Sequence, residues 1–520
     1  MSSKYLCTQI LIRVVGKIRE HHEMKNTLLA GTALVAVLFA SPGFAQTESV
    51  DQADLAALVR AQAGEIAALR ARLDAIEAAK PVGTAAPSPS AAVRTPGVSR
   101  RASTDGDSAS ELFATNIVQP GLAEQTADQA RAEANNTAGV TTEWKGGLPA
   151  FYSPDGKYRF KMRGRIIAHT SSTFGSDYDA RNITTTGMRA LRIGIEGSAG
   201  PNFFYQFEND FADNVSDVGT AFVGWRDKVG DISYDVRFGN MFNDRSFEGS
   251  SGSDAPPFLE RNVVATSIIP QRGFYGISLM PRVFWKSGHA SLTLSGDYID
   301  NRQVVSDSQT LMGRIHWNPV KTERTTLHLG AWGFDEQLAE GAGSLTRNTV
   351  IGGRFNGALR VSSGTLTGGT GTRGYGVEAG GYAGPFWVMG EAGKRNAELD
   401  AGRPDFVSEA WSLSSGYFLT GELPPYNAHL GTFAQPRVLR PVLDGGPGAI
   451  ELLARYENID YSGVPTAGEG WAATAGVNWY LDNVIRLQFN LIHWNAENRS
   501  GAYPTEDSGQ TVSAGVGVTF

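Results

Sequence analysis

The chain has 520 residues, including 62 glycines, and aromatic residues make up 10% of it. Mean hydropathy is -0.21, formal net charge is -7 and the pI is about 5.7. These values disfavour a helical membrane protein, a disordered chain and a general nucleic-acid binder, and suit many short strands. Cys7 is the only cysteine, so no disulfide framework or thiolate metal site is available.

The start of the chain has the pattern of a secretory signal. Residues 24–26 supply a cationic start, residues 28–40 are apolar, and small residues precede a cleavage site after Ala45. The apolar run is shorter than the ~20 residues of a transmembrane helix, although a buried helix is an alternative for it. We expect a signal peptide at 24–45 and an upstream start-site extension at 1–23.

Residues 50–79 show a heptad pattern that is typical of a coiled coil. Apolar residues recur at a and d, and charged residues flank them at e and g. About three heptads are marginal alone, so we expect several copies to be held together, with a single packed amphipathic helix as the alternative. Residues 80–143 begin as a linker rich in Pro, Ala and Ser, and their remainder has no assigned structure.

From Lys157 onward, strand-like runs follow one another almost continuously. Apolar and polar residues alternate in them, as in Leu191–Glu196 and in the last run, Gln510–Phe520. The last run alone fits a soluble β-sandwich equally well. Over the whole region, however, the polar face repeatedly carries charge, and a barrel with lipid outside and water inside accounts for both faces.

Tight turns alternate with long loops such as Gly175–Gly187, Asn243–Arg272 and Asn498–Gly509. We mark about seventeen candidate strands, and an even number is required if both ends lie on one side of the membrane. The weakest, 346–360, is assigned to a long loop. We therefore predict an all-β fold over 145–520: an antiparallel transmembrane β-barrel of about 16 strands, preceded by a short periplasmic coiled-coil helix, with an aqueous channel inside.

Several motifs resemble the phosphate-selective porin O and P family. They are Arg189–Gly197, Phe258–Arg261, Gly416–Glu422, Ala449–Tyr456 and Gly476–Leu481, in the family's order over 145–520. The resemblance implies a sixteen-stranded trimeric outer-membrane porin, often with a periplasmic coiled coil. The partners it implies are further copies of the chain, outer-membrane lipid and small anionic or polar solutes.

A basic column marks the first predicted barrel strand. Arg159, Lys161, Arg163 and Arg165 share one face, with same-face neighbours about 7 Å apart, which suits a pathway for anions along the inner wall. By parity, Arg192, Arg237 and Arg314 also face inward. Family members that select phosphate use such a ladder of arginines and lysines. The alternative is a lumen whose charges balance, because inward acids accompany these cations.

The loop 243–272 is expected to fold inward as the constriction. Its charged residues include Arg245, Asp254, Glu260, Arg261 and Arg272. Phosphate-selective relatives place a lysine shortly before the Glu-Arg pair, whereas this chain has none at 252–255. We therefore expect a porin with a moderate preference for anions such as phosphate, with a weakly selective porin or an outer-membrane anchor acting through the coiled coil as alternatives.

No enzyme motif is recognisable. The chain contains neither HExxH nor GxSxG, and its histidines are expected to lie on different strands and faces, so no catalytic residue, metal site or cofactor is predicted. Aromatic residues near strand ends are expected to form interfacial girdles, with core packing as the alternative. These are Trp332, Trp387, Trp411, Tyr417, Trp479, Tyr480 and Trp494.

Overall fold

The computed structural model describes residues 140–145, 148–212, 214–299, 306–400, 403, 405–464 and 466–520. The predicted upstream extension, signal peptide and coiled coil lie outside these residues, as does most of the predicted linker. None of the helices in the described part of the chain is long and apolar enough to cross a membrane.

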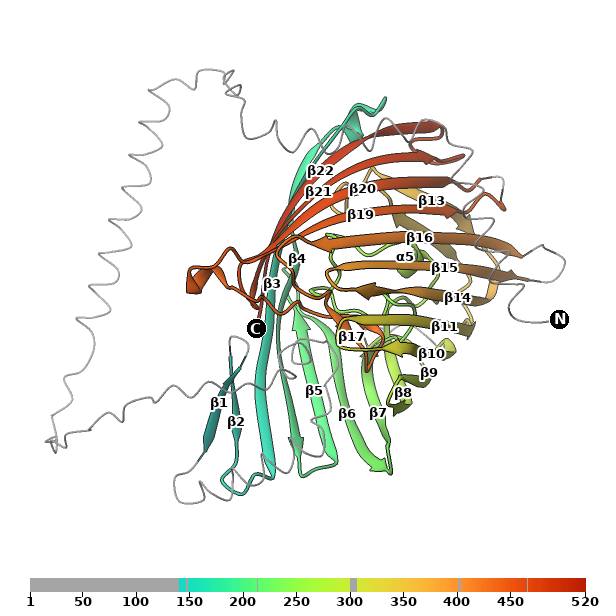
Figure 1. The fold of residues 1–520 in the computed structure, drawn as a ribbon. Helices are drawn as coiled ribbons and strands as arrows, with labels where there is room; N and C mark the ends of the chain where they lie inside the picture. The colour runs from blue at the N-terminus through green and yellow to red at the C-terminus, as the bar shows by residue number, and fades with distance from the viewer. Residues whose placement is uncertain are drawn as a thin grey trace, which may run out of the picture. The chain divides into compact units, whose positions relative to one another are not determined.

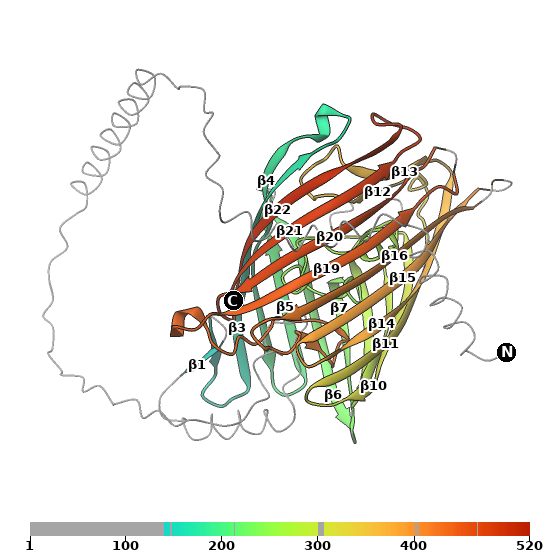
Figure 2. The ribbon, with the colours of Figure 1, turned by 45° about the horizontal axis from the view of Figure 1, so that its top comes forward.

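Sixteen antiparallel strands form a closed barrel (Figures 1 and 2). The ring closes where β22 pairs with β3, from Gln510 opposite Phe174 to Thr519 opposite Arg165. The strand number predicted from the alternating pattern is therefore confirmed. The strands are β3 (Tyr158–Phe174), β4 (Thr184–Ala199), β5 (Phe203–Asp210), β6 (Asp217–Val229), β7 (Ile232–Phe242), β8 (Tyr275–Trp285), β9 (Gly288–Ser295), β10 (Gln309–Lys321), β11 (Thr325–Gln337), β14 (Gly369–Ala383), β15 (Phe386–Leu399), β16 (Phe406–Phe418), β19 (Ala449–Asp460), β20 (Glu469–Tyr480), β21 (Ile485–Glu497) and β22 (Glu506–Thr519).

The period of two places apolar side chains outside and charged side chains inside. On β3, Met162 and Ile166 are exposed on the outer face, whereas Arg163 and Arg165 are buried in the interior. The last strand repeats this arrangement, with Val516 outside and Ser513 inside. Because successive residues of a strand point to opposite faces, the sequence pattern alone determines which residues line the lumen.

An additional hairpin extends the sheet beyond the barrel. Strands β1 (Thr141–Lys145) and β2 (Leu148–Tyr152) pair with each other, and β2 pairs with Arg159–Lys161 of β3. The last strand of the barrel pairs with β3 only as far as Arg165, and beyond it the backbone N–H of Gly164 donates to the carbonyl of Phe520. The hairpin therefore pairs with the part of β3 that the last strand does not reach. Figure 1 shows the hairpin beside the foot of β3.

Antiparallel order places the strand connections at two ends of the barrel, which we call the turn end and the loop end. Both Tyr158, at the start of β3, and Phe520 lie at the turn end. Loop-end connections include η2 (Asp179–Arg181) and the long loops 243–274 and 338–368. The first long loop contains α5 (Val263–Ser267), and the second contains β12 (Leu345–Val350) and β13 (Arg360–Leu366), which pair with each other. The prediction that 346–360 belongs to a loop is thus confirmed.

One turn-end connection is long, which the alternating sequence pattern did not predict. Segment 419–448 contains β17 (Tyr426–Asn427), β18 (Thr432–Phe433) and η3 (Val442–Asp444). The short strands β17 and β18 pair as a hairpin. Phe433 packs against Phe247 of loop 243–274 and against Trp387 of β15, so this hairpin lies within the barrel.

The interior of the barrel is packed by these three segments. One apolar cluster joins Val263 and Ile268 of loop 243–274 to Leu359 of loop 338–368 and to Trp494 of β21. This packing corrects the prediction of aromatic girdles for four residues. Trp332, Trp387, Tyr480 and Trp494 are at most 4% exposed and lie in the core clusters, whereas Tyr417 and Trp479 are exposed.

Candidate functional site: the arginine-rich lumen

The predicted basic column lies on the inner face of β3, but acidic side chains neutralise two of its four residues, Arg163 and Arg165. Arg163 is 3.3 Å from Glu196 and 3.4 Å from Glu208. Arg165 is 2.9 Å from Glu208 and 2.5 Å from Asp254. Lys161 is buried beside them, and Arg159 is partly buried. Anions moving along this face would therefore meet arginines whose charge is locally balanced.

Glu208 of β5 is the centre of this network. Its carboxylate also accepts a hydrogen bond from Arg192 Nη1 at 3.0 Å, and Arg192 Nε donates to Asp210 at 2.7 Å. Three arginines thus share one carboxylate that is only 2% exposed. Removing that acid would leave three buried arginines with one carboxylate each, namely Glu196, Asp254 and Asp210.

The other two inward arginines predicted from parity also have acidic partners. Arg237 lies 3.5 Å from Asp235, which binds Arg282 more closely, at 2.5 Å. Arg314 Nε donates to Glu378 Oε1 at 2.9 Å, and its Nη1 donates to Asp244 Oδ1 at 3.1 Å. These pairs support the alternative in which wall charges balance each other.

Loop 243–274 crosses the barrel interior and contacts strands around the wall. The N–H of Phe247 donates to Glu391 on β15, and the N–H of Val263 donates to Glu457 on β19. The N–H of Leu259 donates to Asn490 on β21. Since Asp254 reaches β3 as well, the loop is attached at widely separated strands.

Five arginines around this loop are held by neutral acceptors instead. Three belong to the loop and were predicted: Arg245 donates to the carbonyl of Ala265, Arg261 to the carbonyls of Glu248 and Ser251, and Arg272 to Thr310, Asn243 and the carbonyl of Tyr275. The other two, Arg347 and Arg395, were not predicted, and both donate to Gln271. Among the residues that the structure describes, no carboxylate forms an ion pair with any of the five.

Burial and repulsion between neighbouring arginines lower the pKa values of the guanidinium groups of the loop. Burial, and then the nearby charges of Arg261 and Arg347, hold the pKa of Arg245 well below its usual value. Burial also lowers the pKa of Arg261 and of Arg272 to about 10 in each case. Arg261 and Arg272 therefore remain cationic near pH 7, so positive charge is concentrated at the loop.

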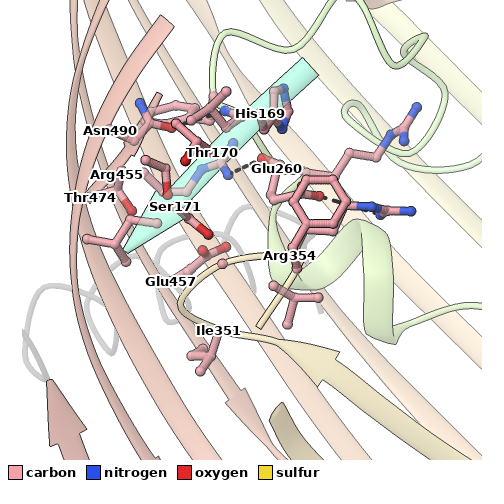
Figure 3. Close-up of a pocket in the computed structure, with 18 residues that line it drawn as sticks. His169, Thr170, Ser171, Glu260, Ile351, Arg354, Arg455, Glu457, Thr474 and Asn490 are labelled. Atoms are coloured by element: carbon pink, nitrogen blue, oxygen red, sulfur yellow. Dashed lines mark hydrogen bonds and ion pairs between the residues drawn. The ribbon is translucent and has the colours of Figure 1, made fainter. Parts of the chain in front are cut away.

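Two small cavities, each of about 40 Å³, lie against the loop and share Arg261 in their linings. One is also lined by Arg192, Arg237 and Arg282 together with Glu208 and Asp244. The other contains Glu260, with Arg354 beside it at 3.7 Å (Figure 3). Arg261 therefore stands between a cavity facing β5–β8 and one facing β19–β21.

Three of the histidines lie on different strands, as expected, but they form one row inside the barrel, which corrects the expectation that they lie on different faces. His289, His316 and His328 lie on the adjacent strands β9, β10 and β11, with ring centroids 4.7 Å and 5.4 Å apart along the row. Strand parity could have detected this row, because the paired residues His289 and His316 share a face. Within the described residues, no set of three His, Cys, Asp or Glu side chains is arranged to hold a metal ion.

Comparison with known proteins identifies the family. The model of the family "Phosphate-selective porin O and P" matches residues 160–520. An uncharacterized protein of Caulobacter vibrioides is 28% identical over 487 residues, which are 88% of this chain and 90% of that protein.

Solved porins are also similar at low sequence identity. The anion-selective porin from Comamonas acidovorans is 14% identical with a TM-score of 0.43, covering 70% of this chain and 100% of that chain. The channel DcaP of Acinetobacter baumannii is 12% identical with a TM-score of 0.40, covering 70% and 97%. The family match extends over more than two thirds of the sequence, so this chain belongs to the phosphate-selective porin O and P family and is a β-barrel porin of the bacterial outer membrane.

Proposed function

We propose that this porin conducts small hydrophilic solutes passively and prefers anions. The arginines around loop 243–274 set this preference. The observation that supports it is the group of five guanidinium groups bound only to neutral acceptors. Arg261, Arg272 and Arg347 are only partly buried, and in this proposal their charge acts on solutes in the lumen. A ring of cations in a narrow pore is a general device for anion selection.

In this proposal the loop narrows the lumen and Arg261 is the cation that a passing anion meets at the narrowest level. Its side chain lines both cavities against the loop. Backbone carbonyls of Glu248 and Ser251 and the rings of Phe242 and Phe274 fix its position. Because these partners are neutral, they orient the guanidinium group without cancelling its charge.

The column Arg159–Arg165 contributes less than its sequence pattern suggests. Glu196, Glu208 and Asp254 neutralise Arg163 and Arg165, and Asp254 lies in the segment where phosphate-selective relatives carry a lysine. We therefore expect phosphate to pass as one anion among several. A weakly selective porin is the second candidate, and the ion pairs of Arg192, Arg237 and Arg314 favour it.

The assembly proposed with this function is a homotrimer in the outer membrane. The signal peptide at 24–45 would direct export, and the heptads at 50–79 would join three copies in the periplasm. An additional anchoring role for that coiled coil is compatible with conduction.

Substitution of Arg261 tests the proposal in planar bilayers. We expect Arg261→Gln to reduce the anion-to-cation permeability ratio about fivefold, because one unit charge at close range in water-like surroundings contributes about 1 kcal/mol. Arg324→Gln, at an exposed turn-end position, is the matched control and leaves the ratio unchanged. An unchanged ratio in Arg261→Gln would favour the weakly selective porin.

A further inference from the structure

A chain of hydrogen bonds connects two segments that enter the barrel from opposite ends. Asp244 Oδ2 of loop 243–274 is 2.9 Å from His289 Nε2 on β9. His289 Nδ1 and His316 Nδ1 of β10 are hydrogen-bonded to each other. His316 Nε2 then lies 3.1 Å from the carbonyl oxygen of Ala428 in segment 419–448. Two imidazole rings thus bridge the loop and the turn-end segment.

The groups at the two ends of this series of hydrogen bonds determine how many protons the two imidazole rings must carry. A carboxylate and a carbonyl can only accept, so each terminal contact needs an N–H from a ring, and the contact between rings needs a third. Two neutral imidazoles carry only two N–H groups in total. All three bonds form only when the pair holds one additional proton, which makes one ring an imidazolium with Asp244 as its countercharge.

The other charged groups around the pair have partners of their own. Arg314 is bound by Glu378 and Asp244, and Arg282 of β8 is bound by Asp235. The groups that face the pair from the packed elements are Arg282, Arg314, His328, Glu378, Asp244, Tyr426 and His429. Asp244 is therefore the carboxylate in direct contact with the pair.

Two neighbouring histidines do not need the additional proton. The hydroxyl of Tyr426 accepts from Asn318, so its own hydrogen is available for His328 Nδ1 at 2.7 Å, and this contact needs no additional proton on His328. His429 stacks on Phe284 with ring centroids 4.0 Å apart, and burial lowers its pKa to about 3. Proton-dependent bonding therefore belongs to His289 and His316.

We propose that the His289–His316 pair is a proton-dependent latch that retains the hairpin 426–433 in the lumen. When the pair loses its additional proton, one of the three bonds between Asp244 and Ala428 breaks and the hairpin is held less firmly. Raising the pH therefore favours release of the hairpin and a wider lumen. This regulation goes beyond the proposed function of passive conduction.

Other contacts limit the size of the effect. Arg314 donates to the carbonyls of Leu430 and Gly431 at 2.8 Å and 2.5 Å at every pH in the physiological range. Loss of one hydrogen bond to a charged group shifts the inserted-to-released equilibrium of the hairpin about tenfold. Burial and the neighbouring guanidinium groups of Arg314 and Arg282 disfavour the additional proton, so the transition is expected at or below the acidic end of the range in which histidine changes charge, about pH 5.

Single-channel conductance between about pH 4 and 8 tests the latch. We expect conductance or open probability of the wild-type porin to rise with pH, and His316→Gln to abolish that dependence because glutamine does not titrate. His328→Gln is the matched control, because it removes a contact to Tyr426 in the same hairpin. It should change the conductance at every pH while retaining the pH dependence. A wild-type channel without pH dependence, or His316→Gln with the wild-type profile, would overturn the proposal.

Amide hydrogen exchange of the peptide covering 426–433 supplies a readout that does not require conduction. After correction for the intrinsic effect of pH, protection should fall about tenfold as the pair loses its proton in the wild-type protein, and should not change in His316→Gln. Equal behaviour of both proteins would reject the latch. A protein that folds but conducts no ions would reject the proposed function and leave this test decisive for the latch.

Discussion

Arg165 Nη1 lies 2.5 Å from Asp254 Oδ1, so a cation of the barrel wall is neutralised by an acid of the inserted loop. We predict that Asp254→Asn increases the anion-to-cation permeability ratio severalfold, because it removes one negative charge from the network in which Arg165 is otherwise balanced only by the shared Glu208. Reversal potentials under a salt gradient measure the ratio. Asp231→Asn, in an exposed turn, controls for the change in net charge. A lower or equal ratio in Asp254→Asn would show that this pair lies off the conduction path.

Glu208 is expected to stabilise the barrel more than any exposed acid. Glu208→Gln leaves Arg163, Arg165 and Arg192 without their shared carboxylate in a buried network, and should reduce the free energy of unfolding by about 3 kcal/mol. Urea unfolding in lipid vesicles checks this value. Glu323→Gln, at an exposed turn, should change it by less than about 0.5 kcal/mol. Equal stability of the two variants would contradict the central role of Glu208.

The attachment of loop 243–274 should weaken in acid through Asp244. Burial opposes ionisation of Asp244, but His289 and Arg314 outweigh it and hold its pKa well below the ordinary value of 3.8. A carboxyl group with a lowered pKa stabilises the folded state above its unfolded pKa, and this contribution is lost as pH falls toward the folded pKa. Thermal unfolding measured between about pH 3 and 7 should show a decline below about pH 4 that is smaller in Asp244→Asn. A decline of equal size in both proteins would assign acid sensitivity to other groups.

Gly431 should be essential for insertion of the turn-end hairpin. Its φ is +61°, and a Cβ there would lie 2.5 Å from Cγ of His316. We predict that Gly431→Ala displaces the hairpin and raises conductance severalfold, since the ring of His316 is fixed by its own hydrogen bonds. Gly445→Ala in the same segment is the control, because its φ of +80° imposes the same backbone strain without a collision. Equal conductance of both variants would show that the hairpin does not obstruct the channel.

Strand parity explains why most of the fold could be predicted. A period of two in β3 or β22 assigns each side chain to lipid or lumen without any tertiary information. Parity also placed Arg192, Arg237 and Arg314 inside. It could not reveal that Glu208 and Asp254 neutralise the column on β3, because that depends on the register between strands and on where the loop lies.

The three inserted segments were harder to predict from sequence. Residues 419–448 carry no long periodic run, since their hairpin consists of two-residue strands. Arg347 reaches Gln271 because loop 338–368 folds into the barrel, whereas Arg395 reaches the same side chain from β15. The cluster of His289, His316 and His328 was detectable from inward parity on three successive strands, but the contact with Ala428 was not.

The decisive experiment for the proposed anion preference is the reversal potential of the wild-type protein under a potassium chloride gradient. Arginines bound to neutral acceptors around loop 243–272 predict an anion-selective potential, and Arg261→Gln moves it toward zero. A cation-selective potential, or one near zero that Arg261→Gln leaves unchanged, would contradict the assignment of selectivity to these arginines.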